Sequence, residues 1–176
     1  MQRLAVIGGT GLIEMTFGQQ LNDAGLILQR KDEVIVETNW GDVPLTCLKL
    51  SSSEGEKELI FLQRHHNNGN PSKPPHMIEH RANISALANS GCDAIMAVCS
   101  VGAISDDFPP GKVALADQYI DFTGVASTFH HEDATFTSVT EPFSEEINDK
   151  LQKILRKAQS FTEEERLLYT YWLAHG

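Results

Sequence analysis

The sequence predicts an α/β domain in which helices cover much of a β-sheet. Short apolar runs that end at glycine are typical of buried strands, and residues 4–7 and 94–101 are two such runs. Residues 76–91 and 145–158 instead have the spacing of apolar and charged residues expected of helices. Strand, long connection, strand, helix and strand in that order favour an α/β fold.

Further strands are predicted from the remaining apolar runs. Residues 45–50 and 59–62 flank a polar turn at 51–56, so they are expected to be strands joined by that turn. A fifth strand is expected over 112–116, after a Pro-Pro-Gly turn, and an extended segment over 167–174.

Both predicted helices carry recognisable end signals. The first begins near His76 after two prolines, presents an apolar face of Ala, Ile and Leu side chains, and ends at Gly91. The second begins after Ser144, which can cap the first backbone N–H groups. Its acidic residues come first and its basic residues last, which complements the helix dipole.

Length and composition favour one cytoplasmic domain over residues 1–176. The chain has 41% apolar residues, a net charge of −10 and no basic run, so nucleic acid and anionic membranes are not expected partners. Three cysteines without a CxxC pair offer no disulfide framework and fit a reducing compartment. The apolar run at the N-terminus is too short for a signal peptide or a membrane span.

Two segments could bind an anion. Gly8-Gly9-Thr10-Gly11 follows a predicted buried strand, so its backbone N–H groups and the Thr10 hydroxyl could approach an anion, although a plain tight turn explains it equally well. The segment matches neither the dinucleotide nor the triphosphate glycine motif. Gln63-Arg64-His65 ends another strand, where ligands gather in α/β sheets, and an Arg fork suits phosphate oxygens; a solvent-exposed edge is the alternative.

Three other segments carry weaker signals. His76, Glu79 and His80 form an H-x-x-E-H pattern whose histidines could hold zinc from one helical face, but no third ligand is evident, so a helix start is favoured. Residues 97–103 end a strand in small residues, which indicates either a packed corner or a ligand contact through Ser100. His130 and His131 lie in a polar loop.

Taken in order, these segments resemble the family of methylthioadenosine, methylthioinosine and trimeric purine nucleoside phosphorylases. The matching stretches are residues 7–12, 61–65, 75–87, 98–102 and 117–123. The resemblance implies a nucleoside phosphorylase fold with a mixed sheet, and a homotrimer for the full-length protein. The implied reaction is attack of inorganic phosphate on the anomeric carbon of a purine nucleoside, with no metal and no organic cofactor.

The resemblance also implies roles for particular residues. The implied phosphate ligands are Thr10, Arg64, His65, Cys99 and Ser100. A thiol is a weak donor, so a contact at Cys99 is expected through the backbone. His130 or His131 corresponds to a loop residue that reaches the neighbouring subunit's 5′-substituent site. Residues 169–176 resemble a strand that precedes the base-binding part, so the catalytic residues are expected beyond Gly176.

The Pro-Pro-His and Arg-Ala-Asn pattern is closest to bacterial methylthioinosine phosphorylases, which makes S-methyl-5′-thioinosine the expected substrate. S-methyl-5′-thioadenosine and general 6-oxopurine nucleosides are alternatives within the family. A truncated fragment that binds phosphate without turnover is a further alternative, and a zinc hydrolase built on His76, Glu79 and His80 is a third.

Overall fold

The computed structural model describes residues 2–9, 12, 21–67, 72–125, 128–159 and 165–174. The chain forms two compact units, Met1–Val101 and Gly102–Gly176. The expectation of a single domain over residues 1–176 stays a prediction.

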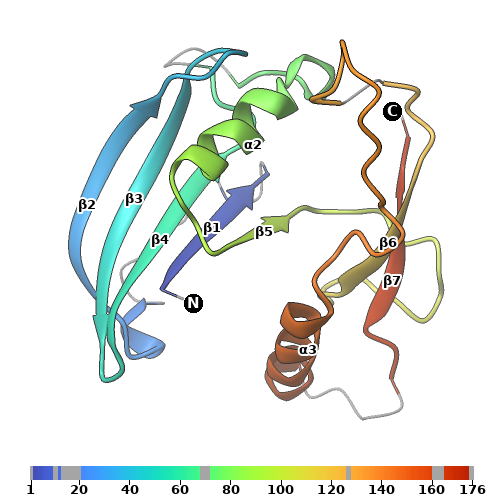
Figure 1. Ribbon diagram of the computed structural model, residues 1–176. Coiled ribbons are helices and arrows are strands. Elements are labelled where there is room, and N and C mark those ends of the chain that lie inside the picture. The colour runs from blue at the N-terminus through green and yellow to red at the C-terminus, as the bar shows by residue number, and fades with distance from the viewer. Residues whose placement is uncertain are drawn as a thin grey trace. The chain divides into compact units, whose positions relative to one another are not determined.

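The first unit is built on a mixed five-stranded sheet (Figure 1). Its strands are β1 (Arg3–Gly8), β2 (Ile27–Val36), β3 (Val43–Ser52), β4 (Gly55–Gln63) and β5 (Ala94–Val98). Their order in the sheet is β2-β3-β4-β1-β5. The β2–β3 and β3–β4 pairs are antiparallel, and β1 pairs parallel with both β4 and β5. The predicted α/β fold with a mixed sheet is confirmed.

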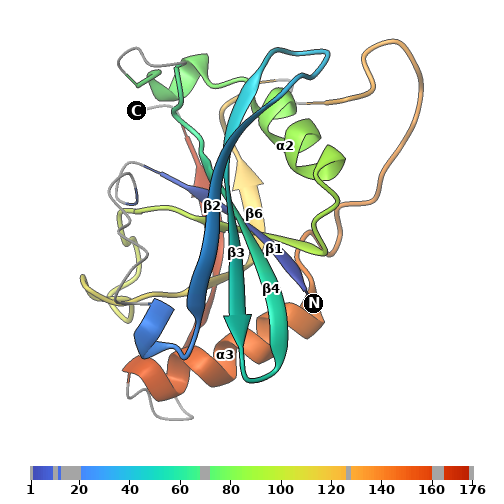
Figure 2. The ribbon, with the colours of Figure 1, turned by 90° about the vertical axis from the view of Figure 1, so that its left-hand side faces the viewer.

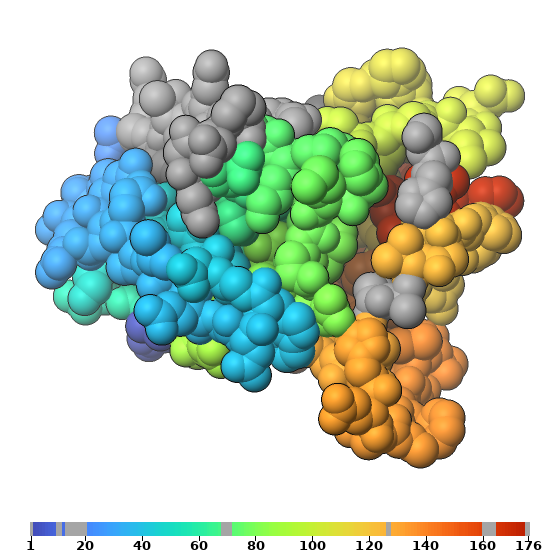
Figure 3. All heavy atoms as spheres, turned by 90° about the horizontal axis from the view of Figure 1, so that it is seen from above, coloured from blue at the N-terminus to red at the C-terminus, as the bar shows by residue number. Residues whose placement is uncertain are grey.

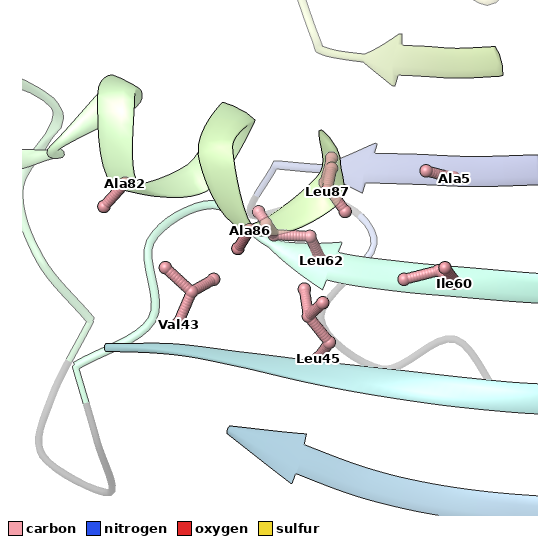
Figure 4. Close-up of a cluster of buried hydrophobic side chains, with 8 residues drawn as sticks. All are labelled: Ala5, Val43, Leu45, Ile60, Leu62, Ala82, Ala86 and Leu87. Carbon is pink, nitrogen blue, oxygen red and sulfur yellow. The ribbon is translucent and has the colours of Figure 1, made fainter. Parts of the chain in front are cut away.

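Helix α2 (His80–Asn89) covers one face of this sheet. The buried side chains of α2 point toward those of β1, β3 and β4 (Figure 4). This cluster consists of Ala5, Val43, Leu45, Ile60, Leu62, Ala82, Ala86 and Leu87. The apolar face predicted for the helix is therefore the face that forms the core.

In the first unit, two sequence predictions needed correction and one strand had not been predicted. The helix begins at His80, because His76 belongs to a separate 3-10 turn, η2 (Pro75–Met77). Strand β2 was not predicted, and it lies at the edge of the sheet beside β3 (Figure 2). Strand β5 was expected to be buried, but Ile95 and Val98 are 41% and 37% exposed.

The second unit contains β6 (Leu115–Asp121), β7 (Leu168–Leu173) and α3 (Glu145–Gln159). The two strands pair in parallel. Ser144 caps α3 as predicted, because its Oγ accepts a hydrogen bond from the Ile147 N–H at 3.3 Å. Asn148 Nδ2 donates to the Ala116 carbonyl at 3.1 Å, which ties α3 to β6. The strand predicted over 112–116 begins later than expected.

Within the part of the chain that the structure describes, no helix is both long and apolar enough to cross a membrane.

Candidate functional site

The ends of three parallel strands meet at one edge of the first unit's sheet. Gly8, the last residue of β1, is in register with Gln63 of β4 and with Val98 of β5. The residues that follow, Gly9, Arg64 and Cys99, therefore leave the sheet at the same edge. This carboxyl edge is where open α/β sheets bind ligands.

Gly9 leaves room for the Arg64 side chain. The Arg64 backbone N–H donates to the Gly8 carbonyl at 3.1 Å, which holds the two turns together. A Cβ atom on Gly9 would lie only 3.1 Å from Nη2 of Arg64 and 3.3 Å from its Cζ. The guanidinium thus lies directly against the glycine turn. Thr10 lies outside the described residues.

Arg64 is oriented by its neighbour His65. Its Nε donates a hydrogen bond to His65 Nε2 at 3.2 Å. The His65 side chain is buried at 5% exposure, and its Nδ1 lies 2.9 Å from the Lys73 carbonyl oxygen. Among the described residues no carboxylate forms an ion pair with Arg64. Within these residues the Nη groups have no ion-pair partner, which suits an arginine that binds an anion.

Arg64 also lines a hollow of about 190 Å³ beside the start of α2. Its other lining residues include Trp40, Asp42, His66, Lys73 and Glu79. In Figure 3 the blue to cyan atoms of the β2–β3 segment lie beside the green atoms of the segment that contains α2. Arg64 and Lys73 bring two cations to this hollow, and Asp42 and Glu79 bring two carboxylates.

His66 lines the same hollow and is held neutral. Its Nε2 lies 2.9 Å from Oδ1 of the buried Asn83. Burial lowers the pKa of His66, and the charge of Lys73 lowers it further, whereas the Asn83 hydrogen bond raises it. At neutral pH His66 therefore contributes hydrogen bonding and not charge to this region.

The H-x-x-E-H segment does not have the geometry expected of one helix. His76 lies in η2, and Glu79 is the N-cap of α2. The Glu79 carboxylate accepts from the backbone N–H and the Nε of Arg81, at 3.2 and 2.9 Å. Hydrogen bonding to Arg81 lowers the pKa of Glu79. In residues the structure describes, no group of three or more His, Cys, Asp or Glu side chains is placed to hold a metal ion.

The other candidate residues are exposed. Cys99 and Ser100 follow β5 at the carboxyl edge, and neither side chain has a hydrogen bond within the described part of the chain. His130 and His131 belong to the second unit, where His130 Nδ1 lies 3.2 Å from an Asp133 carboxylate oxygen. The structure thus brings Arg64 and His65 together with Gly9, and places Cys99 and Ser100 at the same edge.

Sequence reasoning did not assign a role to three residues of this region. Lys73 and His66 lie in the loop after β4, and Asn83 lies in the first turns of α2. Loop residues have no periodic pattern that marks them as inward-facing. The only available signal was Asn83, a polar residue on the otherwise apolar face of the predicted helix.

Comparison with known proteins gives one family. Residues 3–171 match the phosphorylase superfamily. A probable S-methyl-5′-thioinosine phosphorylase of Thermodesulfovibrio yellowstonii is 32% identical over 158 residues, which cover 88% of this chain and 54% of that protein. A 6-oxopurine nucleoside phosphorylase of Pyrococcus furiosus is 32% identical over 160 residues, with 86% and 54% covered. The chain thus spans about half the length of these curated relatives.

Two solved structures of methylthioadenosine phosphorylases have folds similar to that of this chain. A methylthioadenosine phosphorylase from an Antarctic soil metagenomic library superposes with a TM-score of 0.71 at 26% identity, covering 98% of this chain and 54% of that one. A methylthioadenosine phosphorylase from Schistosoma mansoni, in complex with adenine, gives 0.75 at 21% identity and covers 100% and 66%. Because its sequence identity is only 21%, the second similarity is evidence for the fold alone.

Proposed function

Because the chain belongs to the phosphorylase superfamily, we propose that it supplies the phosphate-binding part of a purine nucleoside phosphorylase. In this reaction inorganic phosphate attacks the anomeric carbon of the nucleoside, and the products are a free purine and a sugar 1-phosphate. One observation carries the proposal: the Arg64 guanidinium, oriented by His65, lies at the carboxyl edge of the sheet without a carboxylate partner among the described residues.

The charge that develops during the reaction explains why an arginine would be needed to hold the phosphate. The sugar passes through an oxocarbenium-like transition state, so a bound phosphate both stabilises the positive charge and captures it. Arg64 supplies fixed N–H donors that hold the phosphate in place before the reaction. Thr10, Cys99 and Ser100 follow β1 and β5 in the sequence, and in this proposal their N–H and O–H groups complete the phosphate site.

S-methyl-5′-thioinosine is the proposed substrate, with S-methyl-5′-thioadenosine and 6-oxopurine nucleosides as alternatives. Relatives named for each of these three substrate classes match the chain at similar identity, 32%, 30% and 32%. The proposal includes phosphate as co-substrate, no metal or organic cofactor, a cytoplasmic location and a homotrimer for the whole protein.

The test is phosphate binding by the purified chain, measured by isothermal titration calorimetry. Arg64→Gln should weaken phosphate affinity about tenfold or more, because a charge-assisted hydrogen bond contributes about 1.5–3 kcal/mol. Arg30→Gln is the matched control, since Arg30 is an exposed arginine of β2 that pairs with Asp32. Equal phosphate affinity in the Arg64→Gln and Arg30→Gln variants would overturn the proposed site.

A further inference from the structure

All four polar atoms of His65 are occupied within the first unit. Its backbone N–H donates to Oε1 of Gln63, and its carbonyl accepts from the Lys73 N–H at 2.9 Å. Nδ1 lies 2.9 Å from the Lys73 carbonyl, and Nε2 accepts from Arg64 Nε at 3.2 Å. The side chain is 5% exposed. His65 thus connects the end of β4 to Lys73, and its ring has no free donor for a ligand.

These contacts fix the tautomer of the ring. A carbonyl oxygen can only accept, so Nδ1 must carry the proton that it donates to Lys73. Arg64 Nε can only donate, so Nε2 must be unprotonated. A histidine that binds phosphate through Nε2 needs a proton on that same atom. The two roles therefore require opposite protonation of Nε2.

We propose that the imidazole ring of His65 is a positioning group, which orients Arg64 and does not itself contact the phosphate. The role rests on the proposed phosphate site. Because Nε of Arg64 is already bonded to His65, the guanidinium presents its two Nη groups to the anion. The buried ring and the double connection to Lys73 hold that orientation before phosphate arrives.

The first experiment measures the tautomer of His65 in the wild-type chain by long-range ¹H–¹⁵N correlation NMR, without and with inorganic phosphate. We expect Nε2 to stay unprotonated and Nδ1 to stay protonated in both states. A protonated Nε2 in the phosphate-bound state would overturn the positioning role and assign a direct contact. This measurement needs no variant, so it does not depend on the folding of a mutant protein.

The second experiment is a double-mutant cycle on phosphate affinity. Arg64→Lys keeps the cation and removes the Nε that His65 orients, and His65→Asn shortens the side chain so that it cannot reach Arg64. If His65 acts through Arg64, His65→Asn should weaken affinity about tenfold in the wild type and have little effect beside Arg64→Lys. Equal losses in both backgrounds would show that His65 acts independently of Arg64 and would overturn the proposal.

The controls separate this role from the phosphate site itself. His76→Asn changes an exposed histidine of the same unit and should leave phosphate affinity unchanged. Absence of phosphate binding in the wild-type chain would refute the phosphate site. A bound phosphate together with a protonated Nε2, or with independent losses in the cycle, would refute only the positioning role.

Discussion

The two glycines at the end of β1 have different neighbours, and their substitution should separate binding from stability. A Cβ atom on Gly9 meets the flexible end of Arg64, whereas a Cβ atom on Gly8 would lie 2.8 Å from two ring carbons of the buried Phe61. Gly9→Ala should therefore weaken phosphate binding with little loss of stability. Gly8→Ala should cost about 1–3 kcal/mol of unfolding free energy through overpacking.

Both effects are measurable on the same samples, by urea unfolding and by phosphate titration. If Gly9→Ala binds phosphate as the wild type does, the guanidinium is not held at the glycine turn. If the urea midpoint of Gly8→Ala equals that of the wild type, the Phe61 ring can move aside and the overpacking is absent.

The protonation of His66 should make folding sensitive to mildly acidic pH. Burial, and next the Lys73 charge, hold the pKa of His66 below its ordinary value of about 6.5, so the unfolded chain binds this proton more readily. The resulting stability is fully present above about pH 6.5 and is lost as pH falls toward the folded-state pKa. The free energy of unfolding should thus decrease from about pH 7 to about pH 5.

His66→Gln provides the control for that decrease, because glutamine can still donate to Asn83 and does not titrate. Unfolding in urea across the same pH range should give a shallower decrease for His66→Gln than for the wild type. The pKa of His80 is lowered in the same direction, by partial desolvation and then by the Arg64 charge, so some slope should remain. Identical slopes would show that His66 does not contribute.

At the scale of elements, α2 stabilises the sheet and positions the loop residues of the site. Leu87 is fully buried against β1, β3 and β4, whereas Ile84 on the same helix is 37% exposed. Leu87→Ala should cost about 2–5 kcal/mol through the lost transfer free energy and the cavity. Ile84→Ala should change stability by about 0.5 kcal/mol or less. Urea unfolding of the two variants checks this difference, and equal losses would contradict the assigned faces of α2.

The strands and helices that the sequence predicted share a property: their local pattern agrees with their environment. β1, β3 and β4 have apolar runs because they form the covered middle of the sheet, and α3 has an N-cap and ordered charges. β2 escaped prediction because residues 30–33 are all charged, which is tolerated at a sheet edge. Its pairing with β3 is a tertiary contact that no local pattern encodes.

The candidate site, like the secondary structure, could be predicted only in part from the sequence. Arg64 could be predicted from its place at the end of an apolar run and from the family resemblance. The Lys73 and Asn83 contacts could not, because they depend on how the loop after β4 folds back toward β4 and α2. The structure likewise corrected the helical geometry of His76 and His80, since two prolines before His76 favour a separate turn.

At the scale of the whole chain, the proposed phosphate site and the nucleoside site differ in which residues form them. The proposed anion ligands follow β1, β4 and β5 in the first unit. The family resemblance instead assigns base recognition to segments beyond Gly176, and the chain covers 54% of its curated relatives. We therefore expect that phosphate binding and phosphorolysis can be measured separately on a polypeptide of residues 1–176.

We predict that this polypeptide binds phosphate but releases no purine at a useful rate. Proton delivery to the leaving base contributes about a hundredfold or more to such reactions, and the resemblance places that function outside residues 1–176. An incomplete pocket also admits water, which weakens the electrostatic stabilisation of the oxocarbenium ion by the phosphate. The assay measures free purine from S-methyl-5′-thioinosine, S-methyl-5′-thioadenosine and inosine, each with excess phosphate. The Pyrococcus furiosus phosphorylase serves as the positive control. Turnover close to that control would place a complete nucleoside site within these residues and refute the prediction.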